Sequence, residues 1–162
     1  MPAPLIIVTP TDVDLPPDPI RPDWVLEGSP QVRSKRVAES EDGTSSVMVW
    51  SCTAGKFNWY YSVEEMLHII SGEVFVSDEK GEVRRLGPGD TAFFPSGSRS
   101  TWQVPEHVLK VAVCRHRMPR PLGYLLRAWN KTVDILTGFS KGRVAPLYRP
   151  SASPEGYQVA AE

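Results

Sequence analysis

Residues 55–102 read GKFNWYYSVEEMLHIISGEVFVSDEKGEVRRLGPGDTAFFPSGSRSTW, and this stretch decides the fold. It contains four short runs rich in apolar, aromatic and β-branched residues, and a turn signal closes each run. The turns carry glycine together with aspartate or proline, at residues 78–81, 87–90 and 95–97. Short strands separated by turns about every ten residues are typical of an antiparallel sandwich or barrel. We therefore expect an all-β domain.

The strand pattern continues on either side of this stretch. We expect strands at residues 46–53, 57–61, 100–104 and 108–115, with a turn at residues 54–55. Side chains alternate between the two faces of a strand, so every second residue of each run is predicted to point into the core.

The chain divides into four parts by composition. Residues 1–22 hold seven of the 16 prolines, which predicts an extended arm that lies on the domain or on a partner subunit. Within this arm, residues 5–8 are predicted to add an edge strand. The barrel is expected at residues 23–118. Apolar residues recur at steps of three and four in residues 119–138, which predicts a helix that caps the barrel or packs on a partner. Residues 139–162 are rich in Gly, Pro and Ser and are predicted to form a loosely held tail.

Composition and charge disfavour several classes of protein. The formal net charge of −1 offers no general attraction for nucleic acid or for an anionic membrane. No apolar run approaches the ~18 residues of a membrane span, and the N-terminus lacks the pattern of a signal peptide, so we expect a cytoplasmic protein. The two cysteines, Cys52 and Cys114, lie in separate strand-like runs and are expected to be unpaired thiols.

Two motifs in the central stretch resemble those of the cupin superfamily of jelly-roll barrels. The second half of the first cupin motif, a glutamate followed after six residues by a glycine, fits residues 65–72. The second motif, GxxxxxPxGxxH, fits Gly89, Pro95 and Gly97 but not its final histidine. The sequence of residues 46–113 is similar to the family of ethanolamine-utilisation-type and ureidoglycine aminohydrolase-like cupins. The resemblance implies a cupin jelly-roll β-barrel, or double-stranded β-helix, that commonly forms a homodimer.

The sequence departs from metal-binding cupins at the ligand positions. There, two histidines and a glutamate of the first motif and one histidine of the second bind the metal. In this chain the four positions hold Trp59, Tyr61, Glu65 and Ser100. One carboxylate and one hydroxyl cannot make the usual site for a first-row transition metal, so we expect no metal or other cofactor. His68 lies three residues after the glutamate, an odd offset that turns it to the opposite face of a strand.

The interior is expected to be an aromatic and apolar pocket with few polar groups. Glu65 and Tyr61 are predicted to form an acid–base pair, because desolvation favours the protonated form of a lone buried carboxyl group. The alternative is a glutamate that is hydrogen-bonded for structural reasons alone. Trp59, Ser100 and Trp102 are predicted to contact the ligand, and the sequence leaves open whether the two tryptophans fill the space.

Four basic residues are expected near or around the barrel. Arg99 is predicted to lie at the barrel mouth, where it could recruit a carboxylate or phosphate. The alternative for Arg99, and the expectation for Arg84, Arg85 and Lys110, is a charge solvated at the surface.

Three functions remain open. The first is a metal-independent protein that binds a small anionic or aromatic molecule, with an isomerase or lyase reaction by Glu65 as one version. The second is a metal-dependent, amidohydrolase-like cupin with non-standard ligands. The third is a non-catalytic sensor or assembly module that works through its arm and helix. In the first two cases the expected partner is a small molecule rather than nucleic acid or a membrane.

Overall fold

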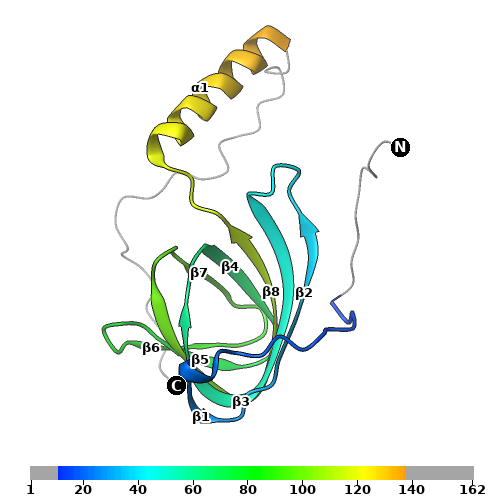
Figure 1. Cartoon of the computed structure of the whole chain (residues 1–162), viewed down its shortest axis with the longest axis vertical. Helices are drawn as coiled ribbons and strands as arrows, with labels where there is room; N and C mark the ends of the chain where they lie inside the picture. Colours follow the sequence, from blue (N-terminus) through cyan, green and yellow to red (C-terminus); the bar gives the residue numbers. More distant parts are fainter. Residues whose placement is uncertain (1–10, 138–162) are drawn as a thin grey trace. The chain divides into compact units, whose positions relative to one another are not determined.

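The computed structural model describes residues 11–137 of the chain (Figure 1). The described part divides at residue 117 into two compact units, each of which is treated by itself. All described strands belong to one antiparallel sheet, so the predicted all-β fold with a C-terminal helix is confirmed. The elements are η1 Pro22–Trp24, β1 Val25–Gly28, β2 Val32–Glu39, β3 Ser45–Tyr60, β4 Glu64–Gly72, β5 Val74–Ser77, β6 Val83–Leu86, β7 Thr91–Phe94, β8 Arg99–Arg115 and α1 Arg120–Thr137.

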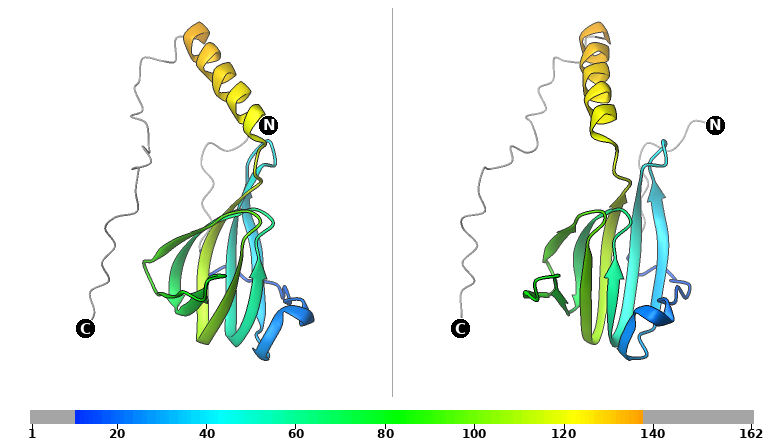
Figure 2. Two further views of the ribbon diagram at one scale, coloured as in Figure 1. Left: turned by 90° about the vertical axis from the view of Figure 1, so that its left-hand side faces the viewer. Right: turned by 60° about the vertical axis from the view of Figure 1, so that its left-hand side comes forward.

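The barrel is built on the two longest strands. β3 and β8 pair along their whole lengths, from Ser45 opposite Arg115 to Tyr60 opposite Arg99. Their outer neighbours change halfway along. β2, β4 and β7 extend one half of the pair, whereas β1, β5 and β6 extend the other. The bent sheet therefore forms two layers whose inner faces oppose each other, as a jelly roll requires (Figure 2).

Two strand boundaries predicted inside these long strands are wrong. The turn expected at residues 54–55 is a register shift within β3, between Thr53 and Gly55, and β8 continues where two strands were expected. A bulge of this kind bends a strand without ending it. Gly55 is required at the bend because a Cβ atom there would lie 2.8 Å from the ring of Pro30.

Strand β4 shows the alternation expected from its sequence. Glu65, Leu67 and Ile69 are buried, whereas Met66 and Ile70 are exposed on the outward face. Since successive side chains of a strand point to opposite faces, the motif glutamate enters the interior, as predicted.

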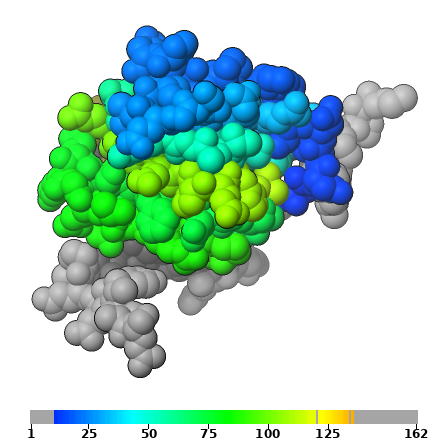
Figure 3. Space-filling view, turned by 90° about the horizontal axis from the view of Figure 1, so that it is seen from below, coloured from blue at the N-terminus to red at the C-terminus, as the bar shows by residue number. Residues whose placement is uncertain are grey.

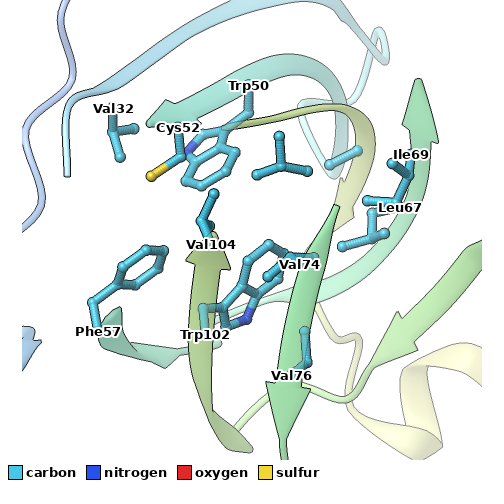
Figure 4. Close-up of a cluster of buried hydrophobic side chains, with 12 residues drawn as sticks. Val32, Trp50, Cys52, Phe57, Leu67, Ile69, Val74, Val76, Trp102 and Val104 are labelled. Carbon is cyan, nitrogen blue, oxygen red and sulfur yellow. The ribbon is translucent and has the colours of Figure 1, made fainter. Parts of the chain in front are cut away.

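Aromatic and aliphatic side chains fill the space between the layers. The rings of Trp102 and Phe57 stack with centroids 6.2 Å apart, and Trp50 meets Trp102 edge-on at 5.8 Å. Trp59 is half-buried and packs against this cluster from its margin. Of the two tryptophans that the sequence left open as fillers of the interior, Trp102 lies in the core together with Trp50 and Phe57, whereas Trp59 lies beside it. The buried cluster, most of which is labelled in Figure 4, consists of Val32, Trp50, Cys52, Phe57, Leu67, Ile69, Val74, Val76, Trp102, Val104, Val108 and Ala112.

One end of the barrel shows the order of the strands directly. In Figure 3 the colours pass from blue through cyan and yellow-green to green across this face. The bands follow the order of the layer that β1, β5 and β6 form with their half of the β3–β8 pair: β1, β3, β8, β5 and β6.

The described part of the N-terminal arm lies along β2. The backbone N–H of Ser34 donates to the carbonyl of Pro16 at 3.1 Å, and the N–H of Asp18 donates to the carbonyl of Val32 at 2.9 Å. Leu15 is buried beside this edge. The arm thus adds isolated backbone hydrogen bonds rather than a regular ladder, as its prolines predict. The edge strand predicted at residues 5–8 lies outside the described residues.

Helix α1 falls within the range predicted from the apolar periodicity. Leu122, Leu125, Leu126 and Trp129 are exposed along it. Among the described residues, no helix is both long and apolar enough to cross a membrane. The tail predicted at residues 139–162 lies outside the described part of the chain.

Candidate ligand pocket and buried ion pair

A buried ion pair occupies the interior of the barrel. Glu65 on β4 and Lys110 on β8 have side-chain exposures of 8% and 3%, and the Nζ of Lys110 donates a hydrogen bond to Oε1 of Glu65. The same Nζ atom lies 4.7 Å from the ring centroid of Trp50 and 4.5 Å from that of Trp102. The ammonium group is thus held between a carboxylate and the faces of two indole rings.

This pair corrects two expectations from the sequence. Lys110 was expected at the surface, but its position on β8 faces inward, where a lysine is tolerated because a carboxylate balances its charge. Glu65 was expected to be the only charge in the interior. The partner of Glu65 is Lys110, so its carboxylate is already neutralised by an ammonium group.

A second polar cluster joins the predicted residues Tyr61, Ser100 and Trp102. The hydroxyl groups of Tyr61 and Ser100 lie 3.0 Å apart, and Nε1 of Trp102 donates to both of them, at 2.9 and 3.0 Å. The ring of Tyr61 also stacks on Phe94 with centroids 4.5 Å apart. Burial, with a smaller contribution from the charge of Glu65, raises the pKa of the Tyr61 phenol far above its usual value, so the phenol stays protonated.

One pocket of this unit lies among β5, β6, β7 and the first residues of β8, with a volume of about 420 Å³, and we refer to this place as the barrel mouth. Apolar, hydroxyl and charged side chains line it, among them the inward-facing Phe94 and the exposed Phe93. Ser100 lines it too, and so connects it to the cluster with Tyr61. The lining residues used below are Val76, Leu86, Ala92, Phe94, Ser100 and Arg99, with Asp78, Glu82 and Arg84 as further charged residues.

A smaller polar hollow of about 260 Å³ adjoins this pocket. The two share Asp78, Arg99 and Ser100 in their linings. The guanidinium of Arg99 pairs with Glu79 at 3.2 Å, and its side chain is 61% exposed. Arg99 therefore lies at the junction of an apolar and a polar space.

The structure separates the predicted site residues into two groups. Ser100 and Arg99 line the pocket, whereas Glu65, Tyr61 and Trp102 belong to the packed interior behind it. The hydrogen bonds of the predicted acid–base pair go elsewhere, from Tyr61 to Ser100 and from Glu65 to Lys110, so the pair itself stays a prediction.

Sequence reasoning missed the residues that form the pocket floor. Alternation along β5 and β7 could have identified Val76, Ala92 and Phe94 as inward-facing, because each alternates with more exposed neighbours. Lys110 had no such local signal, since its partner lies 45 residues away in the chain.

The residues at the cupin ligand positions do not fit a transition metal. Of Trp59, Tyr61, Glu65 and Ser100, only Glu65 offers a carboxylate, and Lys110 already binds it. Within residues 11–137, no group of three or more His, Cys, Asp or Glu side chains has the arrangement to hold a metal ion. His68 is exposed and its Nδ1 lies 3.3 Å from Oγ1 of Thr91, which confirms that it faces away from the interior.

Two antiparallel layers on one long strand pair, with the motif glutamate directed inward, define a cupin barrel. Residues 39–112 match the EutQ-like cupin domain, so this part of the chain is a EutQ-type domain of the cupin superfamily.

Two solved structures with TM-scores above 0.5 share the fold. A protein with unknown function from Pseudomonas syringae pv. tomato DC3000, of the DUF861 family, is 26% identical with a TM-score of 0.60 and aligns over 65% of this chain. A cupin-like protein from Thermotoga maritima is 15% identical over 64% of this chain and 80% of its own, with a TM-score of 0.52. The Clostridium difficile EutQ protein is 20% identical over 54% of this chain, with a TM-score of 0.49.

The present chain spans 46% of the Pseudomonas chain and 64% of the Clostridium chain. No curated protein matches it.

Proposed function

We propose that this protein binds a small organic molecule in the 420 Å³ pocket at the mouth of its barrel. The observation that supports the proposal is the lining of the pocket, which combines apolar side chains with the hydroxyl groups of Thr91, Ser98 and Ser100 and with four charged side chains. Small-molecule sites commonly have volumes of roughly 300–1,000 Å³ and combine apolar walls with a few polar groups.

The lining favours a ligand with an apolar body and an anionic end. Leu86, Ala92 and Phe94 present only hydrocarbon to the body of the ligand, which gains free energy by leaving water. Arg99 is the cation at the junction with the polar hollow. Its ion pair with Glu79 is exposed and therefore weak, so a carboxylate of the ligand can replace Glu79 as its partner.

Binding is favoured over acid–base chemistry because of where the acid lies. Glu65 is 6% exposed, and its carboxylate is engaged by Lys110 rather than directed to the pocket. Ser100 is the one hydroxyl residue of the pocket lining that belongs to the buried polar cluster, and its hydroxyl is already fixed by Tyr61 and Trp102. A hydroxyl held in this way selects ligands by hydrogen bonding.

The test is a screen of small carboxylic acids with aliphatic or aromatic bodies, read by thermal unfolding and by NMR. We expect saturable binding to the wild type and none to Ala92→Phe, which places a ring in the pocket floor. The control is His68→Phe, which adds a ring on the outward face of β4 and should leave binding unchanged. Equal binding to Ala92→Phe and wild type, or no binding of any acid to the wild type, would contradict the proposal.

A further inference from the structure

We propose that the ammonium group of Lys110 is the cation that balances the Glu65 carboxylate in this barrel, in place of a metal ion. The ammonium group donates a hydrogen bond to the carboxylate of Glu65, the group that binds the metal ion in metal-binding cupins. The faces of Trp50 and Trp102 complete the ammonium site. The inference does not depend on the ligand pocket, because none of these four residues belongs to the described pocket lining.

The first argument is charge. The side chain of Lys110 is 3% exposed and that of Glu65 is 8% exposed, so each charge has lost nearly all of its water. An uncompensated buried charge is strongly unfavourable, and the two groups compensate each other through a direct hydrogen bond. A metal cation at the same carboxylate would have to displace the ammonium or lie beside it, and like charges repel at short range in a medium of low polarity.

The second argument is the pair of indole rings. The Nζ atom lies 4.7 and 4.5 Å from the two ring centroids, within the ~6 Å over which a cation is attracted to an aromatic face. Nε1 of Trp50 is buried and, among the described residues, has no hydrogen-bond partner. An indole whose N–H is unpaired is costly in an interior, whereas its face binds a cation better than that of any other side chain. Trp50 therefore fits its position best as part of the ammonium site.

The positions around Glu65 offer no ligands that suit a transition metal. Trp59, Tyr61 and Ser100 stand at the histidine positions of the cupin motifs. Trp59 is half-buried and packed with other rings, and the hydroxyl groups of Tyr61 and Ser100 are hydrogen-bonded to each other. These groups offer no imidazole to a metal, and they are already occupied. The surroundings of Glu65 therefore differ from a metal site at all three histidine positions.

The inference predicts that the site binds a primary ammonium ion when Lys110 is shortened. In Lys110→Ala, the carboxylate and the two indole faces remain, and n-propylammonium has the same heavy atoms as the part of the side chain that is lost. We expect the variant to unfold roughly 10–20 °C below the wild type, since a broken buried pair is strongly destabilising. Addition of n-propylammonium should restore part of this loss in a saturable manner, whereas 1-propanol and sodium ions should not.

The matched control is the double variant Glu65→Gln/Lys110→Ala, in which the interior carries no charge. It should be more stable than Lys110→Ala and should show no response to n-propylammonium. If Lys110→Ala does not fold by itself, the yield of folded protein on refolding with and without n-propylammonium gives the same comparison. A response of equal size in the double variant, or no response in Lys110→Ala, would overturn the inference.

A separate experiment uses the unaltered protein. Wild type purified without a chelating tag is titrated with Mn²⁺, Ni²⁺ and Zn²⁺, and the same titration is made with Glu65→Gln. We expect no thermal shift that depends on Glu65 and no stoichiometric metal by elemental analysis. A shift seen in the wild type and absent from Glu65→Gln would show that a metal reaches this carboxylate, and the inference would fail.

Discussion

Replacing Gly72 by alanine should disrupt the barrel at the point where β4 ends. Gly72 has a φ of +73°, and a Cβ atom there would lie 2.0 Å from the carbonyl oxygen of His107 and 2.7 Å from its carbonyl carbon. The same carbonyl accepts a hydrogen bond from the N–H of Glu73 at 3.1 Å. The new methyl group therefore collides with the backbone of β8 at a position where β8 is also hydrogen-bonded.

The magnitude follows from three contributions. The left-handed backbone conformation costs an alanine roughly 1–2 kcal/mol. Relief of the clash adds about 1–3 kcal/mol for overpacking and about 1 kcal/mol for the weakened hydrogen bond to His107. Gly72→Ala should thus lower the free energy of unfolding by about 3–6 kcal/mol.

Gly81→Ala is the matched control. Gly81 has a φ of +82°, but a Cβ atom there would meet no atom within 4 Å, so only the backbone contribution of roughly 1–2 kcal/mol applies. Urea unfolding followed by circular dichroism and tryptophan fluorescence measures both variants. Equal losses of stability in Gly72→Ala and Gly81→Ala would refute the argument, because the difference between them isolates the clash with His107.

Three further outcomes are expected. Burial raises the pKa of Cys52 from 9.0 to about 12, so this thiol should resist thiol reagents at pH 8 until the protein unfolds, and rapid labelling of native Cys52 would contradict this. The protein should also lose stability as pH rises from 9 towards 12, because only the unfolded Cys52 thiol ionises in this range. Glu79→Gln removes the ion-pair partner of Arg99, so it should tighten the binding of a carboxylic acid several-fold and leave the affinity for the corresponding neutral amide unchanged. Titration calorimetry measures both affinities, and equal effects on the two would exclude a charge contact with Arg99. The homodimer expected from the family resemblance would bury the exposed ring of Phe93, so Phe93→Glu should shift sedimentation towards monomer; a wild-type monomer would rule this out.

The parts of the fold that could be predicted are those that depend on one residue's backbone conformation or on its near neighbours in the chain. Gly72, Gly89 and Gly97 all have positive φ values, so the spacing of the cupin glycines marks the turns. Alternation along β4 likewise placed Glu65 inside, because one face of the strand is apolar and the other is mixed. These signals lie within about ten residues of chain and need no knowledge of the partner strands.

The parts that could not be predicted depend on distant partners. Gly55 has the sequence appearance of a turn, but its packing against Pro30 makes it a bend inside one strand. A lysine in a strand normally indicates a solvated face, and only the approach of Glu65 from β4 makes Lys110 an interior residue. The candidate site was therefore found in part, with its polar members named and its internal cation missed.

The central place of β8 determines when the chain can fold during its synthesis. β8 is the last strand of the sheet, yet β3 lies on one side of it and β4 and β5 lie on the other. A nascent chain that ends before Arg99 therefore has no strand to join its earlier segments, and Trp50 and Leu67 stay in contact with water. Contacts between such distant segments form slowly, so chaperones have the longest access to this protein while β8 is still inside the ribosome.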